Sequence, residues 1–137
     1  MVSGVTVSGS YAQGVTTQAG ANSIITSTRV QDVVFGYGVV CSGSCLFSQG
    51  AITNSGRVGL YCGGAQCGVY LTYFERNDLR DISVVRAGKL TEYHSCPHDI
   101  HLSDGSSALL IEPATCGSID CLNDGTGTYT GTTSVCQ

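Results

Sequence analysis

The chain has 137 residues, which suits one domain, and only 12% of them are charged, about half the share found in ordinary soluble domains. Its formal net charge is −4, and the six basic residues form no electrostatic footprint for a phosphate backbone or an anionic lipid. Composition and charge therefore argue against nucleic-acid binding and membrane-surface binding. No apolar run approaches the length of a membrane span.

The first 28 residues contain no charged side chain. Val5, Val7 and Tyr11 alternate with Thr6, Ser8 and Ser10, a pattern typical of a β-strand. An extended segment with an uncharged edge is adhesive, and natural proteins usually protect such edges with lysine, proline or pairing. We therefore expect residues 1–28 to form a β-prone N-terminal arm that pairs in its own sheet or with another subunit. Residues 29–137 are expected to form the single main domain.

Residues 33–40 read Val-Val-Phe-Gly-Tyr-Gly-Val-Val and predict a strand with Gly36 and Gly38 on one face. Glycines in a strand favour a bulge or a close approach by a neighbouring backbone. A ligand groove is the alternative interpretation.

Three later segments predict β-hairpins, because apolar runs flank short turn-forming sequences. These segments are residues 57–74, 82–96 and 100–112. No window shows a helical period, and we find no internal repeat that indicates a solenoid. The predicted fold is all-β: a disulfide-stapled antiparallel β-sandwich or a jelly-roll-like small barrel.

Eight cysteines, an even number, favour four disulfides and an oxidising compartment, so we expect an extracellular or cell-surface location. The preferred pairs, in order, are Cys62–Cys67, Cys116–Cys121, Cys41–Cys45 and Cys96–Cys136, although sequence alone does not fix the connectivity. Zinc is the competing interpretation. Structural zinc sites favour two residues between paired cysteines, whereas Cys41–Cys45, Cys62–Cys67 and Cys116–Cys121 have three or four between them.

Residues 75–86 hold Arg76 and Arg80 among acidic neighbours, which is typical of a solvated loop. The same segment is a candidate recognition loop, since arginine is favoured at binding hot spots. All three histidines, His94, His98 and His101, lie within eight residues and are a weak candidate metal site. Pro97 and the odd spacing between His98 and His101 argue against coordination in an extended chain.

No residue set predicts an active site. A Gly-x-Ser-x-Gly motif is absent, no pair of carboxylates stands out for glycoside cleavage, and residues 120–127 lack the ligand alternation of a calcium loop. We therefore expect no enzyme activity and no cofactor. The preferred function is an extracellular structural or adhesive subunit that self-assembles through β-strand contacts into a fibre, coat or surface layer. The alternative is a secreted monomeric effector, toxin or lectin-like protein that binds another extracellular protein or a glycan.

Overall fold

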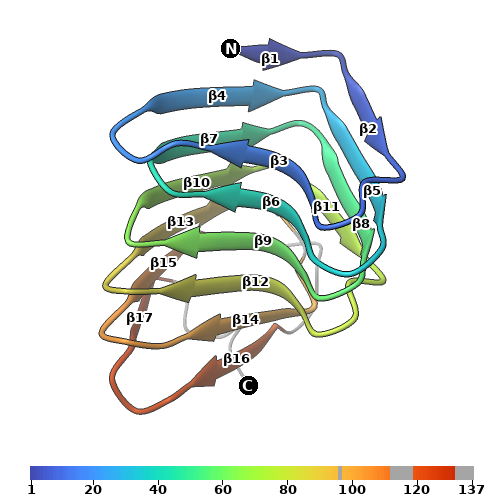
Figure 1. Ribbon diagram of the computed structural model, residues 1–137. Helices are drawn as coiled ribbons and strands as arrows, with labels where there is room; N and C mark the ends of the chain where they lie inside the picture. The colour runs from blue at the N-terminus through green and yellow to red at the C-terminus, as the bar shows by residue number, and fades with distance from the viewer. Residues whose placement is uncertain (96, 112–118, 132–137) are drawn as a thin grey trace.

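The backbone winds as a parallel β-solenoid of about six turns in the computed structural model (Figure 1), which describes residues 1–95, 97–111 and 119–131. Each turn of the solenoid, here called a rung, contributes one strand to each of up to three sheets. The described residues contain no helix long and apolar enough to cross a membrane.

The three sheets are named A, B and C in the order in which the chain first enters them. In spatial order, sheet A contains β1 (Val2–Ser3), β4 (Asn22–Thr26), β7 (Ser44–Ser48), β10 (Gln66–Tyr70), β13 (Lys89–Tyr93), β15 (Ser107–Ile111) and β17 (Thr128–Gly131). Sheet B contains β2 (Thr6–Ser8), β5 (Arg29–Val33), β8 (Ala51–Ser55) and β11 (Tyr73–Glu75). Sheet C contains β3 (Gln13–Thr17), β6 (Tyr37–Cys41), β9 (Val58–Gly63), β12 (Arg80–Val85), β14 (Asp99–Leu102) and β16 (Asp120–Asn123).

The prediction of an all-β fold is confirmed, but the predicted antiparallel sandwich or jelly-roll barrel is wrong. The paired strands of each described sheet run parallel, for example β7 with β10 and β9 with β12. The three expected hairpins are also wrong, because the two runs of each belong to different sheets. β9 lies in sheet C and β10 in sheet A, so the glycine-rich segment between them turns a corner of the solenoid and does not reverse the chain.

The core is built from inward-facing columns in which one residue from each rung stacks on the next. In sheet B the column is Val7, Val30, Ile52 and Phe74, and the last three are fully buried. Val30, Ile52 and Phe74 are 22 residues apart, as are Ile25, Phe47 and Val69 in sheet A. The chain therefore contains an internal repeat, and the interpretation that no repeat indicates a solenoid is wrong. The repeat conserves burial and not residue type, so it leaves no sequence motif.

The corners between sheets are formed by residues in the left-handed backbone conformation. At the corner from A to B these residues are Gly4, Ser27, Gln49 and Leu71, all with positive φ, and His94 has the equivalent position after β13. At the corner from B to C they are Gly9, Asp32, Asn54 and Arg76. One left-handed residue turns the chain sharply between two extended segments, which is what a triangular rung requires. Gln49 and Leu71 are not typical turn formers, which explains why the sequence did not reveal this corner.

Gly36 and Gly38 are positions of close backbone approach, as the preferred interpretation held. A Cβ atom at Gly38 would lie 2.7 Å from the carbonyl oxygen of Gly59 and 2.7 Å from Cγ2 of Ile52. A Cβ atom at Gly36 would collide with the carbonyl of Ala12. Neighbouring rungs thus pack directly against these two glycines.

Candidate assembly surface and polar clusters

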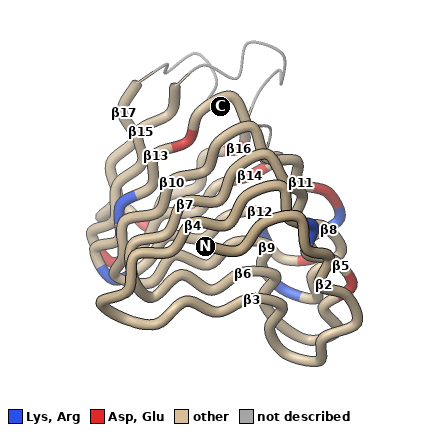
Figure 2. Tube along the Cα trace, turned by 90° about the horizontal axis from the view of Figure 1, so that it is seen from above, with Lys and Arg blue, Asp and Glu red and all other residues tan. Residues whose placement is uncertain are grey.

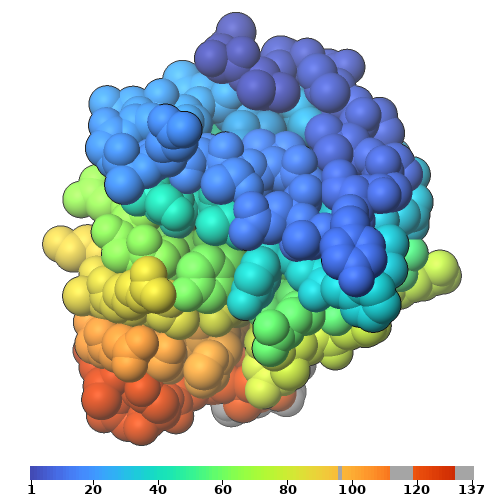
Figure 3. Space-filling model, in the orientation of Figure 1, coloured from blue at the N-terminus to red at the C-terminus, as the bar shows by residue number. Residues whose placement is uncertain are grey.

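The N-terminal end of the solenoid is formed by the first rung, residues 1–17 with β1, β2 and β3. These strands are the outermost members of sheets A, B and C, respectively, and each has a neighbour in its sheet on one side only. Figure 3 shows this rung covering the upper end of the molecule. Residues 1–28, expected to be an arm, are therefore paired within the solenoid itself.

This end exposes apolar side chains and carries no charged side chain. Val2 is 38% exposed, Val5 42% and Tyr11 72%, whereas Val7 is only partly exposed because it stacks on Val30. Of the three N-terminal residues predicted to bind a partner, Val5 and Tyr11 are therefore exposed and Val7 is only partly available. Figure 2, which looks down on this end, shows charged residues on later rungs and none on the first.

The outer edge of the first rung also presents backbone hydrogen-bonding groups. The carbonyl of Val5 accepts a hydrogen bond from the N–H of Arg29 in the second rung. Because a trans peptide places its C=O and N–H on opposite sides, the N–H of Thr6 points away from β5. The carbonyl of Ala12 likewise accepts from the N–H of Tyr37, so the N–H of Gln13 faces outward from β3. An added strand would find donors in place at both positions.

Two disulfides cross the corner between sheets C and A in successive rungs. They are Cys41–Cys45 and Cys62–Cys67, the pairs expected for these four cysteines. Cys41 is in register with Cys62, and Cys45 with Cys67, so the two bridges stack inside the corner. The other two expected pairs, Cys116–Cys121 and Cys96–Cys136, include residues outside the described part of the chain. The described disulfides fit an oxidising environment.

Arg76 and Arg80, the predicted recognition residues, are separated by the short connection between β11 (Tyr73–Glu75) and β12 (Arg80–Val85). Arg76 occupies the left-handed position at the corner from B to C, and its side chain is 3.8 Å from the carboxylate of Glu75. Arg80 begins β12 and lies 3.6 Å from Asp99 of the next rung. Each arginine is therefore paired with an acidic neighbour, which weakens the case for a shared hot spot.

The three histidines are separated as well. His94 lies at the corner after β13 with its ring against Tyr93, His98 precedes β14, and His101 lies within β14. Among the described residues, no three His, Cys, Asp or Glu side chains come together as a metal site. The clustering in sequence therefore does not become a cluster in space.

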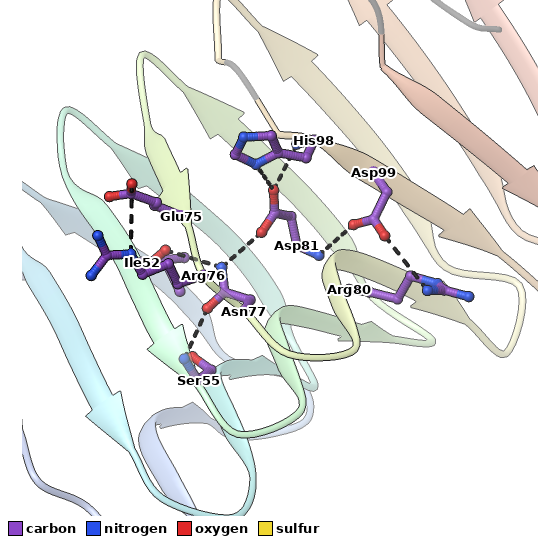
Figure 4. Close-up of polar contacts among 9 residues, drawn as sticks. All are labelled: Ile52, Ser55, Glu75, Arg76, Asn77, Arg80, Asp81, His98 and Asp99. Carbon is purple, nitrogen blue, oxygen red and sulfur yellow. Dashed lines mark hydrogen bonds and ion pairs between the residues drawn. The ribbon is translucent and has the colours of Figure 1, made fainter.

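Asp81 is the centre of a polar network that the sequence did not reveal (Figure 4). It is 3% exposed, and its Oδ1 accepts a hydrogen bond of 2.9 Å from Nδ2 of Asn77. Its Oδ2 lies 2.6 Å from the backbone nitrogen and 2.9 Å from Nδ1 of His98. Asn77 also accepts from the N–H of Ser55. The network joins three consecutive rungs at one corner, and satisfied buried groups of this kind rigidify a fold.

Asp99 continues this network into the next rung. Its Oδ1 accepts a hydrogen bond of 2.6 Å from the backbone N–H of Asp81. Partial burial, followed by the nearby charges of Asp81 and Asp120, raises the pKa of Asp99. The side chains of Asp81 and Asp99 therefore connect neighbouring rungs, and they accept hydrogen bonds from protein groups.

A shallow groove of about 550 Å³ runs along the outer face of sheet A. One side is a row of polar side chains from four successive rungs, Asn22, Ser44, Gln66 and Lys89, and the floor contains Ile24, Leu46 and Gly68. Within the described residues, the side chains of this polar row form no hydrogen bonds with the protein. They are available to an external ligand.

No protein-family model, no curated protein and no solved structure matches this chain in the comparisons with known proteins.

Proposed function

We propose that the protein is a non-enzymatic extracellular structural or adhesive subunit that self-assembles through β-strand pairing at its N-terminal rung. The observation that carries this proposal is the combination of three outermost strands, outward N–H groups at Thr6 and Gln13, and a segment of 28 residues without one charged side chain. Proteins that remain monomeric usually place lysine, proline or a covering segment at such an edge. The stacked disulfides would make each subunit rigid.

The occupant of this edge is proposed to be a second copy of the chain. A surface without charged side chains tolerates close approach of an identical surface, because no like-charged side chains are brought together. The exposed Val2 and Val5 side chains and the Tyr11–Phe35 pair, whose ring centroids are 5.1 Å apart, would be covered in the contact. Backbone hydrogen bonds would supply the affinity, and these side chains would set the register between the two copies.

The test is the mass of the protein in solution by light scattering after size exclusion, over a range of concentrations under non-reducing conditions. Assemblies that grow with concentration are expected for the wild-type chain. Thr6→Pro removes the outward N–H without removing a hydrogen bond to β5, and should shift the protein toward monomer. Thr6→Val retains the N–H and is the matched control.

A wild-type monomer at every concentration would contradict the proposal, as would equal assembly by Thr6→Pro and Thr6→Val. Deletion of the first rung is a poorer test. It would unpair β4, β5 and β6 and thereby create a new edge one rung further along.

A second candidate function, a lectin-like secreted binding protein, is favoured by the groove on sheet A. Its polar row repeats at the spacing of adjacent strands, about 4.8 Å, and carries one charge, that of Lys89. Amide and hydroxyl groups spaced in this way would suit an uncharged, repeating ligand such as a glycan chain. Binding to a glycan array that is lost in Gln66→Ala would support this function, and it would leave the assembly test unaffected.

A further inference from the structure

Glu92 occupies an inward-facing position in the middle of an apolar column. Its register partners are Val69 on β10 and Leu110 on β15, and the same column contains Ile25 and Phe47. The side chain of Glu92 is fully buried. A carboxyl group at such a position is costly unless it is neutral or fully hydrogen-bonded.

The hydrogen bonds of Glu92 are incomplete. Its Oε1 accepts a hydrogen bond of 2.6 Å from the backbone N–H of Ser95, but its Oε2 has no partner among the described residues. Asp81, which is buried to a similar degree, receives donors on both oxygens. Both oxygens of Asp81 are therefore satisfied, whereas the unpartnered Oε2 of Glu92 makes the negative charge of an ionised Glu92 especially costly.

Among the described residues, no charged side chain compensates the charge of an ionised Glu92. Burial raises the pKa of its carboxyl to about 7, and the N–H of Ser95 offsets this only in part. The titratable side chains on the surrounding described strands are not among the causes of that shift. They are Lys89 and Tyr93 on β13 itself, Tyr70 on β10, Arg80 and Asp81 on β12, and Asp99 and His101 on β14.

We propose that Glu92 is a pH-sensitive latch: as the neutral acid it holds the rungs formed by β14 to β17 against the solenoid, and its ionisation releases them. The carboxyl loses its proton to solvent, and the resulting carboxylate is stabilised only where water can reach it. Water reaches it when β15 separates from β13. This device is independent of the assembly edge, which lies at the other end of the molecule (Figure 1).

The solenoid is expected to open on the C-terminal side of Glu92 because fewer described strands lie on that side. On the N-terminal side, β10 is followed by three further strands of sheet A and by three strands of sheet B. On the C-terminal side, the described strands of sheet A are β15 and β17, and no described strand of sheet B lies beyond β11. Solenoids open most readily from the end with fewer stabilising neighbours.

The test is hydrogen exchange of the intact protein at pH 5 and pH 8, with protection factors corrected for the intrinsic exchange rate. In the wild-type chain, protection of β15 and β17 amides should fall on the order of 50-fold between the two pH values, given a closed-state pKa of about 7 and an ordinary open-state pKa. Amides of β4 and β7 should not change. Glu92→Gln, which cannot ionise, should abolish the difference.

A second variant, Glu92→Met, keeps the test decisive if the buried amide prevents folding, because methionine has a similar length and is apolar. It should also show no dependence on pH. The proposal is overturned if either variant retains the loss of protection, or if all strands lose protection together.

Discussion

Oδ2 of Asp81 lies within hydrogen-bonding distance of both the backbone nitrogen of His98, at 2.6 Å, and the Nδ1 atom of its ring, at 2.9 Å. The aspartate is buried on β12, while the side chain of His98 is 73% exposed. One residue therefore fixes the backbone and the ring orientation of the other, and this contact links two rungs where the described part of sheet B has ended.

This relationship predicts unequal effects of removing the two side chains. Asp81→Ala leaves the N–H of His98 and the amide of Asn77 without their acceptor, and should reduce the free energy of unfolding by about 3 kcal/mol. His98→Ala preserves the backbone hydrogen bond and should cost less than about 1 kcal/mol. Urea denaturation measures both values. Equal losses would show that the ring contact, and not the backbone contact, matters most.

The stability of the protein should decrease as pH rises through the range set by Glu92. Between about 4.5 and 7 the folded protein retains a proton that the unfolded chain has lost, so the extra stability is complete below that range and lost above it. The loss in the free energy of unfolding should be about 3 kcal/mol. Thermal denaturation from pH 4.5 to 8 measures it. Subtracting the same series for Glu92→Gln removes contributions from other groups such as Asp99.

Each of the two stacked disulfides should contribute modestly to the free energy of unfolding, because each closes a short loop. The bridged cysteines are 4 and 5 residues apart in sequence, and the loop-entropy relation then gives about 2 kcal/mol per bridge. The paired variants Cys41→Ala with Cys45→Ala, and Cys62→Ala with Cys67→Ala, should each lose about this amount in urea denaturation. Loss of folding in either would indicate that the buried sulfur atoms are needed for packing between rungs.

Gly38 should be far more sensitive to substitution than Gly68, although both lie within strands. A Cβ atom at Gly38 would approach the backbone oxygen of Gly59 at 2.7 Å, so Gly38→Ala should cost about 2 to 3 kcal/mol. At Gly68 the nearest atom is the flexible end of Leu46 at 3.0 Å, so Gly68→Ala should change stability by less than about 1 kcal/mol. Comparison of the two melting temperatures checks this prediction. A similarly small loss of stability in both variants would mean that neighbouring rungs shift easily to accommodate the added Cβ atom.

Part of the fold and site could be derived from the sequence because it depends on local chemistry. The even cysteine count and short spacings indicated Cys41–Cys45 and Cys62–Cys67, which the structure contains. Alternation of apolar and polar residues indicated strands, and the paired glycines at 36 and 38 indicated close backbone approach. The lack of charge in residues 1–28 is also a property of sequence, and it is the basis of the proposed assembly edge.

Only the tertiary structure decided how the strands pair and which polar groups meet. A strand of a given pattern can pair in parallel or antiparallel fashion, and the choice here depends on left-handed corners at residues such as Gln49 and Leu71, which have no turn signature. Asp81 contacts residues 4 and 17 positions away in sequence, and Glu92 is buried because Val69 and Leu110 stack on either side. Such contacts depend on the register between rungs, which is set by the packing of the whole core and not by any short segment.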